Sequence, residues 1–173
     1  MYALDRLSGA IDALNTAIGH AVRWGVLGMV LVGAFNAIAR YSGRFVGVNL
    51  SSNALIEAQW YLFAAVFLLA TPYALVLDRH VRVDVLHSRL SNRGRAAIDL
   101  AGTAVFLLPL CVFAVVISLP SVRASWAVWE QSPDPGGLPR YPVKTLVPVA
   151  FALLFLQGLA QAVKHVNVLR SER

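Results

Sequence analysis

Four stretches of about 20 apolar residues, almost free of charged side chains, constrain this 173-residue chain more than any other feature. A helix of that length crosses the ~30 Å hydrocarbon core of a bilayer. Lipid offers backbone amides no water, so such stretches must be helical. The sequence therefore predicts an all-α integral membrane protein that forms one domain over residues 1–173. Its four transmembrane spans are expected at about 22–41, 56–77, 98–120 and 144–164.

The composition excludes several other classes of protein. Hydrophobic residues make up 58% of the chain and charged residues 14%, whereas soluble domains carry roughly 25% charge. The net charge of +6 does not indicate a nucleic-acid partner, because the arginines lie between the spans, where they set topology. A single cysteine, Cys111, excludes a disulfide scaffold.

The first 20 residues have a different pattern. Leucine and isoleucine recur at a 3/4 spacing and share one helical face: Leu4, Leu7, Ile11, Leu14 and Ile18. Polar residues lie opposite them: Asp5, Asp12, Asn15 and Thr16. This pattern predicts an amphipathic arm, residues 1–20, that lies in the membrane interface or packs on a partner.

Positive charge sets the predicted orientation. The loop expected at 78–95 is rich in arginine and should be cytoplasmic. Four spans then place both termini on the cytoplasmic side. The loop expected at 121–143 lies on the outer side and carries prolines and glycines that disfavour a continuous helix.

Charged residues near the ends of the spans are candidate polar sites. Arg40 ends the first span and Glu57 begins the second, so antiparallel packing predicts that they lie close together. One interpretation is a proton or ion site. The other, which we favour because Glu57 lies near the headgroup level, is a structural ion pair or a contact with a partner subunit.

Small residues mark candidate helix contacts, because they let helix backbones approach closely. They lie in the first and fourth spans: Gly25, Gly33, Ala37, Gly158 and Ala162.

Histidine raises the alternative of haem or quinone binding, but the four histidines lie near cytoplasmic ends or in the cytoplasmic loop: His20, His80, His87 and His165. They form no pair at mid-membrane depth, and no thiolate cluster supports a zinc site. No catalytic residue, cofactor or metal is therefore predicted, and the chain is not expected to be an enzyme.

Several motifs resemble those of the small membrane subunit (DctQ-like) of tripartite ATP-independent periplasmic (TRAP) transporters. The end of the first span at 35–41, the glutamate-led opening of the second at 57–63 and the sequence His-Val-Arg-Val-Asp at 80–84 are similar to family signatures. The last of these supplies three polar anchors in addition to Arg40 and Glu57: His80, Arg82 and Asp84. The outer loop resembles the mannitol/chloroaromatic or keto-acid branch in these residues: Glu130, Ser132, Gly136, Gly137, Leu138, Pro139 and Lys144.

This resemblance implies a non-catalytic subunit in a bacterial inner membrane. It would pack against and stabilise a large permease, while a periplasmic solute-binding protein delivers organic acids or related solutes. The outer-loop motif is expected to face one of those two partners. Two alternatives stay open from the residues alone: a haem- or quinone-binding anchor of a respiratory oxidoreductase, and a small exporter that acts as a homodimer.

Overall fold

The computed structural model describes residues 2–47, 51–78 and 90–171. Within them, the chain is helical and has no strand. The helices are α1 (Tyr2–Val46), α2 (Asn53–Val76), α4 (Asn92–Gly102), the π-helical segment η1 (Thr103–Leu107), α5 (Leu108–Ala127) and α6 (Tyr141–Ser171). Four helical runs in the described part are long and apolar enough to cross a membrane, which confirms the prediction of an all-α, four-helix membrane protein.

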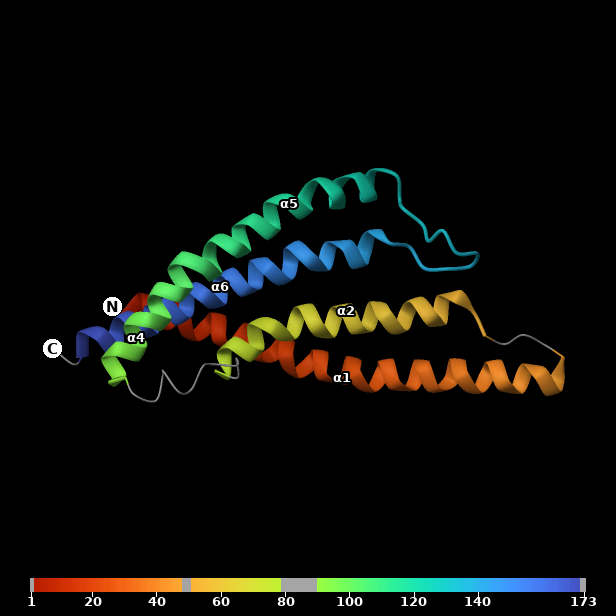
Figure 1. Cartoon of the computed structure of the whole chain (residues 1–173), viewed down its shortest axis with the longest axis horizontal. Coiled ribbons are helices and arrows are strands. Elements are labelled where there is room, and N and C mark those ends of the chain that lie inside the picture. The colour runs from red at the N-terminus through yellow and green to blue at the C-terminus, as the bar shows by residue number, and fades with distance from the viewer. Residues whose placement is uncertain (1, 48–50, 79–89, 172–173) are drawn as a thin grey trace.

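Helix α6 forms the centre of an open array (Figure 1). α2, α4 and α5 pack against it, α1 packs along α2, and the N-terminal part of α1 also contacts α6. A third of the most apolar stretch of α6 is buried, against 6% in each of the other three spans. The other helices therefore present broad apolar faces outward.

Helix α1 joins the predicted arm and the predicted first span into one helix of 45 residues. At 1.5 Å per residue it is about 68 Å long, roughly twice the thickness of a bilayer core. The polar face of the arm packs against α6, and its apolar face points outward: Leu4 and Leu7 are 56% and 58% exposed. The arm therefore continues into the first span without a break and packs against a helix of the same chain.

The third predicted span is part of a longer run from Asn92 to Ala127 that contains the π-helical turn η1. Pro109 lies two residues beyond this turn and has no amide hydrogen to donate to the preceding turn. A local change to π geometry is a common way for a helix to absorb such a defect.

The predicted outer loop is shorter in the structure, at residues 128–140. Residues 121–127 continue α5 beyond Pro120, and 141–143 begin α6. We refer to residues 128–140 as the α5–α6 loop. It lies at one end of the molecule, the loop end, and both chain termini lie at the opposite end (Figure 1).

Candidate functional site at the loop end

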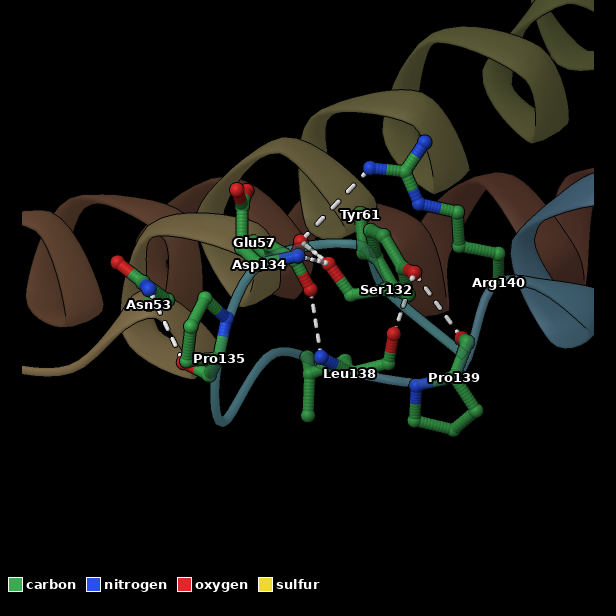
Figure 2. A network of polar contacts seen from close by, with 9 residues as sticks. All are labelled: Asn53, Glu57, Tyr61, Ser132, Asp134, Pro135, Leu138, Pro139 and Arg140. Carbon is green, nitrogen blue, oxygen red and sulfur yellow. Dashed lines mark hydrogen bonds and ion pairs between the residues drawn. The ribbon is translucent and has the colours of Figure 1, made fainter. Parts of the chain in front are cut away.

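A buried carboxylate organises the loop end. Glu57, in the first turns of α2, is 3% exposed. It accepts hydrogen bonds from the Ser132 hydroxyl and from the Leu138 backbone N–H, the latter at 2.5 Å. The Arg140 guanidinium lies 3.9 Å from Oε1 (Figure 2). Hydrogen bonds to an ionised acceptor are stronger than neutral ones, so Glu57 fixes the loop to α2.

Two further residues of α2 hold the same loop. Asn53 Nδ2 donates to the Pro135 carbonyl at 3.0 Å, and the Tyr61 hydroxyl donates to the Pro139 carbonyl at 3.0 Å. Asn53, Glu57 and Tyr61 are four residues apart, so they share one helical face. Figure 2 shows the loop lying along that face. α2 therefore supplies the loop with donors and an acceptor that the irregular backbone lacks.

The two glycines of the loop have different structural roles. A Cβ atom on Gly137 would lie 2.5 Å from Ser132 Cβ and 2.7 Å from Glu57 Oε2, so any side chain there displaces the loop from the carboxylate. A Cβ on Gly136 would meet nothing within 4 Å, but its φ of +71° favours glycine. Gly136 therefore permits the turn, and Gly137 permits the close approach of the loop to Glu57.

A second carboxylate joins the loop to α5 and α6. Glu130 accepts hydrogen bonds from Ser125 Oγ at 2.6 Å and from Lys144 Nζ. These two contacts, the lysine first, lower the pKa of Glu130 below its ordinary value. The Glu130 carbonyl accepts from the Arg140 backbone N–H at 2.8 Å, which closes the base of the loop.

Aromatic rings pack beside this second carboxylate. Trp126, Trp129 and Tyr141 lie with centroids 4.4–5.7 Å apart. Trp126 Nε1 donates to Thr145 Oγ1 at 2.9 Å. Rings with one polar atom are typical of the water–lipid boundary, so the loop end has the chemistry of a membrane surface.

The predicted pairing of Arg40 with Glu57 is wrong. The cation beside Glu57 is Arg140, and Arg40 is exposed at the rim of a cavity of about 570 Å³ that Asn53 and Pro135 also line. The physical reason is that the α5–α6 loop folds over the carboxylate and occupies its acceptor sites. The sequence did carry a signal for Arg140, since it directly follows the Gly-Gly-Leu-Pro motif.

The other predicted residues are dispersed. The anchors His80, Arg82 and Asp84 lie outside the described residues. Gly25 and Gly33 face α2, where added Cβ atoms would lie 3.0 Å from Val66 and 2.9 Å from Gln59.

The small residues of the fourth span have a different neighbour from those of the first. A Cβ on Gly158 would lie 3.0 Å from Leu108 of α5. Ala162 borders a groove between α6 and α1, and Ala37 of the first span is exposed. The small residues predicted as helix contacts therefore lie in three kinds of place: the α1–α2 contact, the α5–α6 contact and exposed surface.

Sequence reasoning missed a second polar contact region, which we call the α1–α6 seam: Asp5, Ser8, Asp12 and Asn15 with Gln157, Ala160, Lys164 and Asn167. Asn15 Nδ2 donates to Gln157 Oε1 at 2.7 Å, and both side chains are buried. Gln157 Nε2 donates to Asp12 at 2.8 Å, and Lys164 pairs with Asp12 at 2.6 Å. The signal was the alignment of polar residues on one face of the arm.

These geometries indicate structural rather than chemical roles. Neighbouring donors occupy both oxygens of Glu57, which leaves the carboxylate poorly placed to exchange a proton or ion during transport. Within the residues that the structure describes, no three histidine, cysteine or acidic side chains gather as a metal site.

Comparison with known families decides the assignment. The family model for the DctQ component of tripartite ATP-independent periplasmic transporters matches residues 29–168. The chain belongs to this family. The match begins within the first span and includes the second and third spans, the α5–α6 loop and most of α6, and it supports a transporter component over the haem- or quinone-binding anchor. No curated protein and no solved structure matches the chain.

Proposed function

We propose that this protein is the non-catalytic small membrane subunit of a TRAP transporter, which packs against and stabilises the large permease. The observation that carries the proposal is the family match over residues 29–168. The open array supports it, because α1, α2 and α5 present apolar faces that a larger membrane subunit can cover.

The proposal assigns solute and ion transport to the large permease. In the described spans, charged side chains flank long apolar stretches: between Arg23 and Arg40 of α1, and between Lys144 and Lys164 of α6, there is none. A carrier is expected to hold ionisable groups deep in its spans.

The remaining parts of the proposal follow from the same assignment. The protein resides in a bacterial inner membrane with both termini cytoplasmic, and both termini do lie at one end of the molecule (Figure 1). A periplasmic solute-binding protein delivers organic acids or related solutes. The α5–α6 loop then faces the periplasm, where the permease or the binding protein contacts it.

Reconstitution into liposomes tests the proposal. Liposomes are prepared with this chain and the large permease of the same transport system, and the binding protein is added outside. They are expected to accumulate an organic acid when an ion gradient is imposed to drive the uptake. Omitting this chain should abolish uptake and lower the yield of folded permease. Transport by this chain alone would contradict the proposal and favour a self-sufficient exporter.

A further inference from the structure

A groove on the side of the α1–α6 seam has the dimensions and chemistry of a lipid site. It encloses about 640 Å³ between the first turns of α1 and the C-terminal half of α6. Its walls are predominantly aliphatic: Leu7, Ile11, Leu156, Leu159, Val163 and Val166. Its volume lies in the range of small-molecule pockets.

The floor of the groove is closed by the seam itself. The Ser8 hydroxyl donates to the Ala160 carbonyl at 3.3 Å, and both residues are buried. This contact holds the two helices together beneath the groove. The aliphatic walls above it leave a trough that a flexible hydrocarbon chain can fill.

One end of the groove is polar and carries a cation. Asp5 accepts a hydrogen bond from Asn167 Nδ2 at 2.7 Å, so this carboxylate already has a donor. Arg170 lines the same end, in the last turn of α6, is exposed, and has no hydrogen bond or ion pair with the residues that the structure describes. A guanidinium beside an apolar trough complements a phosphate attached to an acyl chain.

The distribution of charge along the groove decides between a lipid and a helix of another protein. An apolar helix needs only the aliphatic walls, whereas a phospholipid joins an acyl chain to a charged headgroup, which matches the aliphatic walls with Arg170 at one end. We propose that this groove binds an anionic phospholipid, with an acyl chain along the aliphatic walls and the headgroup phosphate on Arg170.

Native mass spectrometry of the full chain, purified in mild detergent and exposed to micelles containing phosphatidylglycerol or phosphatidylcholine, tests this site. The wild type is expected to retain one phosphatidylglycerol and to prefer it over phosphatidylcholine. Ala162→Trp, which fills the groove, should lower the retained lipid roughly tenfold. Arg170→Gln should keep the lipid but lose the preference for the anionic headgroup.

Matched variants separate binding from misfolding. Ala101→Trp and Arg93→Gln alter exposed positions of α4 and should leave both lipid retention and headgroup preference unchanged. If Ala162→Trp fails to fold, judged by helical circular dichroism, Leu7→Arg replaces it, because Leu7 is 58% exposed on the groove wall. Leu7→Arg should also lower retention.

Three outcomes would overturn the proposal. The first is a wild type without bound lipid, and the second is equal retention by the wild type and the groove variants. The third is a stable dimer in which a second copy of the chain fills the groove in place of lipid. An unchanged headgroup preference in Arg170→Gln would overturn the assignment of the phosphate to Arg170.

Discussion

The loop end and the α1–α6 seam show two ways in which this protein satisfies polar groups next to lipid. At the loop end, side chains of α2 bond to the backbone of an irregular segment: Asn53 and Tyr61 donate to carbonyls, and Glu57 accepts from an amide. At the seam, side chains of two regular helices bond mainly to one another, as in Asn15 with Gln157.

The difference follows from the backbone. A helix satisfies its own amides and carbonyls, so polar contacts between helices must come from side chains. A loop leaves backbone groups unpaired, and these need external partners. The loop end therefore depends on a few residues with strict geometry, whereas the seam distributes its polar contacts over several pairs. The predictions below test this contrast, from the largest expected effect to the smallest.

Removal of the Glu57 carboxylate should have the largest effect. Glu57→Ala deletes the acceptor for both Ser132 and Leu138, so we expect the α5–α6 loop to detach from α2. Trypsin cleavage after Arg140, followed by mass spectrometry, should then accelerate by roughly tenfold or more. Asp134→Ala, at an exposed loop position, is the control and should leave the rate near that of the wild type. An unchanged rate in Glu57→Ala would show that the loop folds without α2.

The two glycines should differ in their sensitivity to alanine. Gly137→Ala drives a methyl group into Ser132 and Glu57 and should cost about 1–3 kcal/mol. Gly136→Ala meets open space but strains a positive φ, at a cost of about 1–2 kcal/mol. Thermal unfolding in detergent measures both, and Gly137→Ala should also accelerate cleavage at Arg140. Equal cleavage rates in the two variants would argue against the close approach at Gly137.

The seam should show only weak coupling between its residues. Asn15→Leu removes the donor to Gln157 Oε1, while Gln157 keeps its hydrogen bond to Asp12, and Gln157→Leu leaves the buried Asn15 amide without its acceptor; each change should cost about 1–3 kcal/mol. The coupling between the two changes should be nearer 0.6 kcal/mol, as is usual for polar pairs in membrane proteins. A double-mutant cycle on unfolding free energy in mixed micelles measures it, with Thr16→Val as a control on the same helix. Strictly additive effects would mean that the two amides do not stabilise each other.

Charge removal should distinguish the two arginines near the loop end. Arg140 lies 3.9 Å from Glu57 and its side chain is 33% exposed, so Arg140→Gln should lower Tm slightly. Arg40→Gln should leave Tm unchanged, because Arg40 is exposed and is not the cation beside Glu57. A larger loss of Tm in Arg40→Gln than in Arg140→Gln would restore the pairing expected from the sequence.

The smallest expected effect is a dependence on acid. The pKa of Glu130 is lowered by Lys144 and Ser125 from an ordinary value of 4.5. Its contribution to stability is therefore complete above about pH 4.5 and is lost as the pH falls through the lower pKa of the folded state. Fluorescence of the neighbouring Trp126 and Trp129 should report this loss, and Glu130→Gln should remove the dependence. A transition above pH 5 would contradict this assignment.

The sequence by itself determined that this chain is a four-span membrane protein. It also identified Glu57 and the Gly-Gly-Leu-Pro segment as candidate site residues. Hydrophobic length is a local property, since about 20 consecutive residues suffice to match a bilayer. The glycines were also visible, because positive φ and close approach both select for the absence of a side chain.

Only the tertiary structure decided which polar groups meet. Glu57 bonds to a residue 81 positions later, and Asn15 to one 142 positions later. Such pairs depend on the rotation and crossing of helices, which packing sets across the whole chain. The sequence therefore paired Glu57 with Arg40 and turned the apolar face of the arm toward a surface. In the structure, Arg140 takes the first role, and α6 covers the polar face of the arm.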